Sequence, residues 1–212
     1  MVSTSYRTFA VWIGLAASLI AMASVSGQSS TSKAQSGPAY TAADVQFMQG
    51  MIGHHAQAVV MAAMAPTHGA STKVALFCRK IDISQRDEIV LMQTWLRDRG
   101  QAVPDPLAPM DHDAMAGMDM GAHSMLMPGM LTPAQLKQLD QARDTTFDRL
   151  FLTFMIQHHL GALTMVATLF DSPGAGQTPE IFGYATGVDA DQRAEIERME
   201  GMLSPLQGRT PQ

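Results

Sequence analysis

The segment FMQGMIGHHAQAVVMAAM, residues 47–64, recurs 104 residues later as FLTFMIQHHLGALTMVAT, residues 151–168. The two segments share 8 of 18 residues, including a His-His pair in each copy. A second shared block follows each copy, QRDEIVLMQTWL at 85–96 and QRAEIERMEGML at 192–203, with 6 identities in 12 positions. The chain therefore carries the same structural unit twice.

Both blocks have the sequence features of helices. Three places carry start signals, namely Thr41 with Asp44, Thr132-Pro133 with Gln135, and Thr178-Pro179. Apolar residues recur at helical spacing in the second block of each copy: Ile89, Met92 and Leu96, then Ile196, Met199 and Leu203. Pro and Gly residues near 66–69 and 172–174 break each copy into a hairpin. We therefore predict an all-α fold, a four-helix bundle of two duplicated hairpins, with a short extra helix over 131–142.

The composition excludes some functions. The chain has 212 residues and a formal net charge of −5, which does not favour nucleic-acid binding. It contains 18 Met and 7 His but a single Cys. Cys78 has no partner for an internal disulfide or a multi-cysteine metal site, and we expect it to be a buried helix residue.

The N-terminus has the pattern of a secretory signal peptide. A short segment with one Arg precedes an apolar run over residues 9–25, and small residues follow. We predict a signal peptide over 1–27, a flexible lead-in over 28–39 and a helical domain over 40–208. The alternative is an uncleaved N-terminal anchor, and only in that case do we expect contact with a membrane. No other segment is expected to span a bilayer.

The repeated segment places sulfur and imidazole side chains on one helix face. At about 100° per residue, the residues of interest in the first copy share a stripe about 140° wide. They are Met48, Met51, His54, His55 and Met61, and the second copy supplies Met155, His158, His159 and Met165, with Leu152 in place of Met48. Thioethers prefer Cu(I) and Ag(I), and imidazole also binds Cu(II). These nine residues are therefore candidate metal ligands, although methionine at this spacing is also common as core filler.

The connection between the copies, residues 104–130, has the composition of a flexible loop rather than a helix. Its methionines and histidines are a second set of candidate ligands: Met110, His112, Met115, Met118, Met120, His123, Met125, Met127 and Met130. We expect this loop to capture metal ions weakly and pass them inward. The alternative is a linker without a metal role.

Catalytic metal chemistry is less well supported by the sequence. A di-iron bundle needs Glu-x-x-His pairs, but Met51 and Met155 stand three residues before His54 and His158. Glu88 and Glu195 recur in the two copies, and we expect each to lie beside the apolar stripe rather than in a ligand array. The HExxH, GxSxG, P-loop and dinucleotide motifs are absent from the sequence. A metal-dependent oxidase and a metal-free structural bundle stay open as alternatives.

The two MI-x-HH segments, each followed by Q-R-x-E-I-x-x-M, resemble the domain of unknown function 305 family over about residues 40–208. The resemblance implies export, a ferritin-like four-helix arrangement, and a copper-binding role in the periplasm linked to copper resistance. It also implies that the Met and His residues of the two motifs are ligands. The sequence of residues 110–118 is similar to the Met-rich copper-binding segments of other exported resistance proteins. The two copies depart from the family's Gln-Gly-Ala after the His pair: the first has 56–58 as Ala-Gln-Ala and the second has 160–162 as Leu-Gly-Ala.

These observations predict a non-enzymatic, periplasmic copper-binding protein that buffers or carries Cu(I), with Ag(I) and Cu(II) as further ions. The expected partners are metal ions and, by implication, another periplasmic copper carrier or an efflux component. The sequence does not decide whether the two hairpins share one metal site or hold two.

Overall fold

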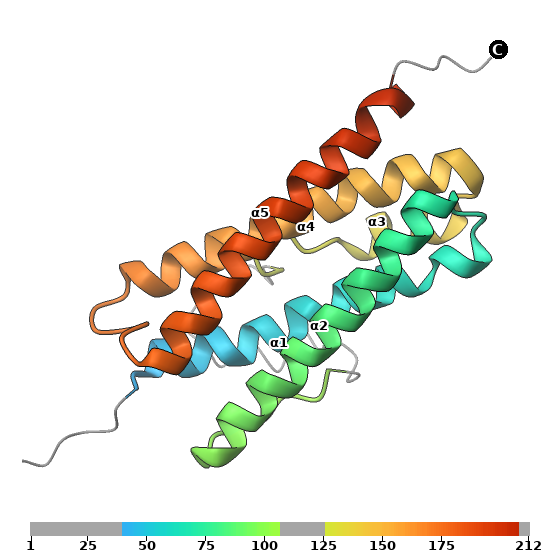
Figure 1. The fold of residues 1–212 in the computed structure, drawn as a ribbon. Coiled ribbons are helices and arrows are strands. Elements are labelled where there is room, and N and C mark those ends of the chain that lie inside the picture. Colours follow the sequence, from blue (N-terminus) through green and yellow to red (C-terminus); the bar gives the residue numbers. More distant parts are fainter. Residues whose placement is uncertain (1–39, 107–125, 208–212) are drawn as a thin grey trace, which may run out of the picture. The chain divides into compact units, whose positions relative to one another are not determined.

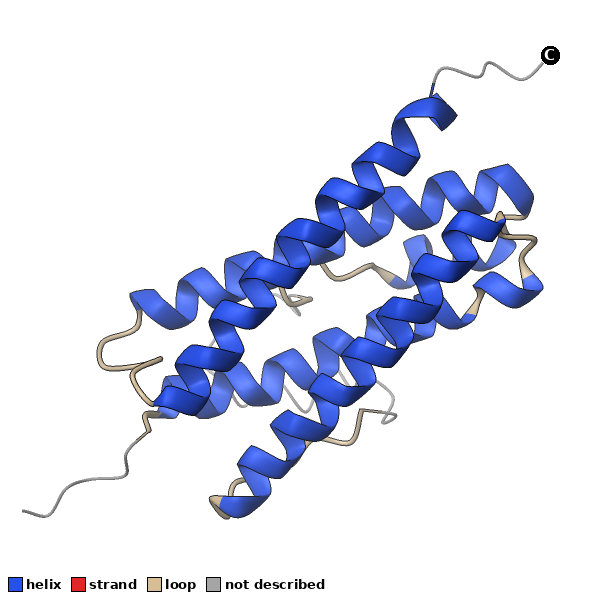
Figure 2. Ribbon diagram, in the orientation of Figure 1, coloured by secondary structure: helices blue, strands red, loops and turns tan. Residues whose placement is uncertain are grey.

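The computed structural model describes residues 40–106 and 126–207, and these are folded as helices and connecting turns (Figures 1 and 2). The elements in chain order are α1 (Ala42–Ala63), the 3-10 turn η1 (Ala65–Thr67), α2 (Thr72–Asp98), α3 (Pro133–Gln141), α4 (Asp144–Asp171) and α5 (Pro179–Gln207). No strand occurs in these two ranges. The prediction of an all-α fold is therefore confirmed. The expected signal peptide and lead-in, and residues 107–125 of the Met-rich loop, lie outside the described residues.

The helix starts follow from local side-chain chemistry. Thr41 and Asp44 cap α1 reciprocally, with Asp44 N donating to Thr41 Oγ1 at 3.2 Å and Thr41 N donating to Asp44 Oδ2 at 2.7 Å. Thr132 and Gln135 form the same capping box at α3, as the sequence predicts. The second carboxylate oxygen of Asp44 accepts from Gly176 N at 2.7 Å. This bond ties the start of α1 to the turn between α4 and α5.

The four long helices form two hairpins. α1 packs along α2, α4 packs along α5, and α1 also packs against α4 (Figure 1). α2 and α5, drawn green and red, make few contacts with one another. The two halves of the repeat are thus joined through their first helices, the ones that carry the His-His pairs.

Two apolar clusters fill the core. The first cluster contains the end of α1 and the start of α4, including Met61, Phe151 and Met155. The second cluster contains the start of α1 and the end of α4, including Met48 and Met51. Because each cluster joins opposite ends of the two helices, α1 and α4 run antiparallel. Both His-His pairs fall between the two clusters along these helices.

The single cysteine lies in the first apolar cluster, as the sequence predicts. Cys78 is buried on α2, and its thiol is free. Burial raises the pKa of this thiol to about 12, and the nearby Asp148 charge acts in the same direction. The thiolate, which is the reactive form and the form that binds metals, is therefore scarce at neutral pH.

One property of α4 differs from the sequence expectation. Its length and its mean hydropathy of 1.4 over an 18-residue window are sufficient to cross a membrane, a property that we expected only of the N-terminal segment. Half of this window is buried inside the helical core. The core helix of a globular protein meets the same criterion, so the property alone does not place α4 in a membrane.

Candidate metal centre

The four histidines of the two repeats meet where α1 crosses α4. His54 and His158 come closest, with ring centroids 3.8 Å apart and ring planes inclined by 36°. Their sequence neighbours lie further out: the His54 and His55 rings are 6.5 Å apart, and those of His158 and His159 are 6.2 Å apart. All four side chains are fully buried. The duplication therefore places equivalent imidazoles from both copies in one interior layer.

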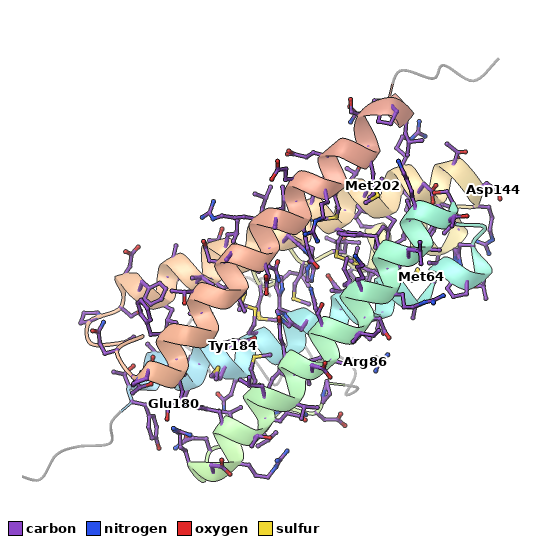
Figure 3. All side chains as sticks on the ribbon, viewed as in Figure 1. Met64, Arg86, Asp144, Glu180, Tyr184 and Met202 are labelled. Atoms are coloured by element: carbon purple, nitrogen blue, oxygen red, sulfur yellow. The ribbon has the colours of Figure 1, made fainter. Side chains whose placement is uncertain are left out.

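Methionines flank this imidazole layer on both sides. Met61 and Met155 belong to the first apolar cluster, whereas Met48 and Met51 belong to the second, and half-buried Met165 packs against the second. Each side of the layer thus receives methionines from both copies of the repeat. Figure 3 shows the sulfur atoms among the side chains enclosed by the long helices. All the candidate ligands predicted on α1 and α4 therefore lie in or beside this core.

Three of the histidines have a neighbour that fixes which ring nitrogen carries the proton. His159 Nε2 lies 2.7 Å from a carboxylate oxygen of Glu195, and His55 Nε2 contacts a carboxylate oxygen of Glu88. An ionised carboxylate only accepts, so Nε2 of each imidazole donates. In the neutral ring the lone pair is then on Nδ1. A carboxylate that holds the outer nitrogen of a histidine is the usual support for a metal ligand.

The third fixed imidazole is held by the backbone. His54 Nε2 donates to the carbonyl oxygen of Pro128 at 3.0 Å, which leaves the lone pair of the neutral ring on Nδ1. His158 has no such support, and neither of its ring nitrogens has a hydrogen-bond partner among the described residues. The Nδ1 atoms of His54, His55 and His159 are buried and unpartnered as well.

Unpartnered buried nitrogens are costly, at about 1–3 kcal/mol each. The layer holds at least one such lone-pair nitrogen on each of the four imidazoles. A metal ion accepts lone pairs, and one bound between His54 and His158 would satisfy a nitrogen of each ring. The residues present therefore fit a metal ion better than they fit an apolar core.

The buried surroundings of His54 and His158 keep both imidazoles in the neutral form that binds a metal. Burial lowers the pKa of His54 to about 3, and the charge that His55 can carry adds to this lowering. Burial also lowers the pKa of His158 well below its usual range, with the neighbouring histidines acting in the same direction. Both rings are therefore neutral at physiological pH, and no proton has to leave before their nitrogens coordinate a metal.

The donor set indicates which metals suit the centre. Within residues 40–106 and 126–207, no group of three or more His, Cys, Asp and Glu side chains lies close enough together to hold a metal ion. A site in this layer therefore needs the methionine sulfurs besides imidazole. Imidazole and thioether together are soft ligands, which suit Cu(I) and Ag(I) better than hard ions such as Mg²⁺ or Ca²⁺.

A strap formed by residues 126–131 crosses α1 and α4 over the imidazole layer. The backbone of Leu131 exchanges two hydrogen bonds with the Gln57 side chain, at 2.6 and 3.0 Å. At Gly161, an added Cβ would lie 1.9 Å from the carbonyl oxygen of Pro128, so only glycine allows this crossing. Met130 is buried and Met127 is half-buried. The last residues of the loop predicted over 104–130 thus form a loop, but they pack against α1 and α4, which the prediction did not include.

The strap explains a difference between the two copies of the repeat. Gln57 and Gly161 stand at equivalent positions, two residues after each His pair. Gln57 holds the strap by two hydrogen bonds, and Gly161 makes room for it. At this position Gly161 keeps the glycine of the family pattern, whereas Gln57 departs from it, and neither residue changes a candidate ligand.

Sequence reasoning missed the residues that support the imidazoles. We expected Glu88 and Glu195 to lie beside the apolar stripe without a place in the site, but they contact His55 and His159. The signal was the shared Q-R-x-E sequence, which carries both glutamates at equivalent positions. Seven predicted ligands lie outside the described residues: Met110, His112, Met115, Met118, Met120, His123 and Met125.

Solved structures of other proteins are similar to this chain in sequence and in fold. A fragment of a DUF305 protein from Deinococcus radiodurans is 30% identical with a TM-score of 0.63, covering 78% of this chain and 98% of its own. A structure described as a putative secreted DUF305 protein from Streptomyces coelicolor is 24% identical with a TM-score of 0.65, covering 80% and 97%. At this identity it supports the fold alone.

CopM is a further structural relative, and its structures include Cu(I)-bound, Cu(II)-bound and silver-bound forms. The Cu(II)-bound form is 28% identical to this chain with a TM-score of 0.58, covering 76% of this chain and 96% of CopM. None of the curated proteins matches the sequence. The family model described as domain of unknown function (DUF305) matches residues 44–203, which include both His-His pairs and both glutamates. The chain therefore belongs to the DUF305 family.

Proposed function

We propose that this protein is an exported, non-enzymatic copper-binding protein that holds Cu(I) in the buried imidazole layer. One observation carries the proposal: four fully buried histidines from the two repeats meet, each with an unpartnered ring nitrogen. The copper-bound and silver-bound forms of CopM support the same class of metal. Ag(I) and Cu(II) are further ions that this centre would accept.

The ligands that we propose within the helices are the four imidazoles together with the methionines that flank them. The imidazoles supply nitrogen donors, of which those of His54 and His158 are neutral without losing a proton, and the methionines supply soft sulfur. Sulfur ligands of this kind form no disulfides, which suits an oxidising compartment outside the cytoplasm. The proposed set is Met48, Met51, His54, His55, Met61, Met155, His158, His159 and Met165.

Copper competition tests the proposal directly. Purified protein is titrated against a chromophoric Cu(I) chelator, beside a variant in which His54, His55, His158 and His159 are all changed to Ala. We expect the wild type to take Cu(I) from the chelator and the variant to lose this ability. A second variant, His54→Leu with His158→Leu, keeps apolar bulk in the core, and circular dichroism verifies its folding. Equal copper retention in the folded variants would exclude the imidazole layer as the binding site.

A matched control separates this loss from the general effect of removing a histidine. His68 is buried outside the layer and donates from Nε2 to the backbone carbonyl of Asp140 at 2.9 Å. We expect His68→Ala to lower stability and to leave copper affinity unchanged. The non-enzymatic part of the proposal is tested by loading the wild type with copper or iron. Ferroxidase or cuprous oxidase turnover would contradict it.

The Met-rich loop has its own part in the proposal, which is to capture copper weakly and pass it to the centre. Its contribution is tested by changing the five methionines from Met110 to Met125 to Leu. We expect a lower copper stoichiometry and slower uptake, with the tight site retained. Unchanged stoichiometry and uptake rate would exclude this role. Protection of the cell envelope against copper, with an efflux component or a second carrier receiving the ion, is the physiological role that we infer.

A further inference from the structure

The proposed centre is fully buried, so an ion needs a route to it. From the α1–α4 side, the strap covers the layer and Pro128 occupies the outer nitrogen of His54. The other boundary is the seam between α2 and α5, the two long helices that make few contacts with one another. In Figure 3 these helices carry the labelled Arg86 and Tyr184.

A cavity of about 220 Å³, lined mostly by polar and charged residues, lies in this seam. Both of its walls carry equivalent residues of the repeat, α2 supplying Gln85 and Glu88, and α5 supplying their counterparts Gln192 and Glu195. Ser84 on α2 and Ala194 on α5 also line the cavity. Glu88 and Glu195 are the carboxylates that contact His55 and His159. The cavity therefore reaches within one side chain of an imidazole from each copy.

Two buried amides in the cavity point to a ligand. Gln85 and Gln192 are 2% and 3% exposed. Neither amide atom of Gln85 has a hydrogen-bond partner in the described part of the chain, and the Oε1 atom of Gln192 has none either. A buried amide without a partner costs about 1–3 kcal/mol, and both copies of the repeat carry one here. Water or a hydrated ion in the cavity would supply the missing partners.

The charges in the cavity favour a cation. Three carboxylates, those of Glu88, Asp191 and Glu195, stand against the two cationic side chains of Lys80 and Arg198. Amide and carboxylate oxygens are the donors that replace water around a hydrated cation. Glu88 and Glu195 remain partly exposed, at 25% and 16%, so they contact solvent and imidazole at once.

We propose that the cavity between α2 and α5 is an outer docking site for a hydrated metal cation and the route by which that cation reaches the imidazole layer. The amide oxygens of Gln85 and Gln192 receive the ion together with Glu88 and Glu195. The ion then exchanges these oxygens for the Nδ1 atoms of His55 and His159, because the Nε2 atoms of both rings donate to the two glutamates. This inference rests on the proposed copper-binding function and adds a site and a direction of travel to it.

Two plug variants test the route, one from each wall. Ser84→Trp and Ala194→Trp each place a large ring in the cavity, and each has a control on the exposed surface of the same helix, Ile83→Trp and Ala190→Trp. The variants are mixed with Cu(II) sulfate in a stopped-flow spectrometer, which follows ligand-to-copper charge-transfer absorbance. Equilibrium affinity is measured separately by chelator competition.

We expect both plugs to load about tenfold more slowly than their controls, with equilibrium affinity within about twofold of wild type, because a blocked route changes the rate and leaves the final site intact. Plug variants that load at the control rate would overturn the proposal. A plug that lowers affinity and rate together would also overturn it, because the cavity would then be part of the final site. A wild type that binds no copper would instead end the proposed function itself.

Discussion

The substitution Gly161→Ala tests whether the strap has to lie directly against α4. Gly161 lies on α4, where the strap crosses the helix backbone to backbone. A Cβ at this position would lie 1.9 Å from the carbonyl oxygen of Pro128 and 2.6 Å from the Cα of Gly129. Ordinary contact begins at 3.4 Å, so Gly161→Ala forces the Pro128 oxygen to move by 3.4 − 1.9 = 1.5 Å. Backbone on both sides of the contact leaves no flexible side chain to absorb this shift.

A shift of this size breaks the hydrogen bonds that hold the strap. They are His54 Nε2 to Pro128 O at 3.0 Å, Gln157 Nε2 to the Gly129 carbonyl at 3.2 Å, and the pair between Gln57 and Leu131. Four bonds at about 1 kcal/mol each amount to about 4 kcal/mol, and the better helix propensity of alanine returns about 1 kcal/mol. We therefore expect Gly161→Ala to lower the free energy of unfolding by about 3 kcal/mol.

The same shift reaches the metal centre through His54. Without Pro128 as acceptor, the His54 ring is no longer held in one orientation, and losing such a supporting contact lowers metal affinity by about tenfold or more. Urea unfolding and Cu(I) competition measure the two effects. Gly187→Ala on α5 is the matched control, because an added Cβ there meets nothing within 4 Å. We expect this control to be about 1 kcal/mol more stable than wild type. A Gly161→Ala protein as stable as Gly187→Ala, with wild-type copper affinity, would refute this account of the strap.

The remaining predictions concern the imidazoles and one thioether. Glu195→Gln should lower Cu(I) affinity by about tenfold, because the carboxylate supports His159. Glu200→Gln on the exposed face should leave Cu(I) affinity unchanged. Equal affinities of the two variants in chelator competition would argue against this support. Met155→Leu should change the free energy of unfolding by less than about 1.5 kcal/mol, because leucine keeps the side-chain volume. It should still weaken Cu(I) binding, because the sulfur is lost. Chelator-competition data identical to wild type would remove this methionine from the ligand set. The pKa of His54 is about 3 when folded and 6.5 when unfolded, so the unfolded chain binds the proton first as pH falls below 6.5. As pH falls from about 6 to about 4, this histidine should therefore lower the unfolding free energy of the metal-free protein by about 1.4 kcal/mol per pH unit, measured in urea titrations. An unfolding free energy that is constant over this window would contradict the prediction.

The repeated sequence predicted which face of each copy carries the candidate ligands, but it did not decide whether the two copies share one site. Two copies of one hairpin tend to pack about an approximate twofold axis, and residues near such an axis meet their own equivalents. His54 and His158 are equivalent residues, and their rings are the closest pair in the layer. The capping residues likewise predicted where α1 and α3 begin, because a cap depends on neighbours only three residues away.

The supporting contacts could not be predicted in the same way. A helical stripe shows which face of a helix is apolar, but it does not show how far a side chain at the edge of that stripe reaches into the next helix. Glu88 reaches His55 across 33 residues of sequence, and Glu195 reaches His159 across 36. Both contacts depend on the packing of α1 on α2 and of α4 on α5. The packing of the strap could not be predicted for a different reason. Its Met, Pro and Gly residues have the composition of a loop whether or not they pack against the helices.

The strap also makes the two halves of the centre unequal. It supplies a backbone acceptor to His54 of the first repeat, whereas the equivalent His158 has both ring nitrogens without a partner in the described residues. His158 is therefore the one imidazole that can present either nitrogen to a metal, while the other three are each held in one orientation. A fixed His54 beside an adaptable His158 allows a centre to keep its shape and still accommodate ions that differ in size and preferred geometry. On this reasoning, supplying an acceptor to His158 would narrow the range of metals bound before it abolished binding.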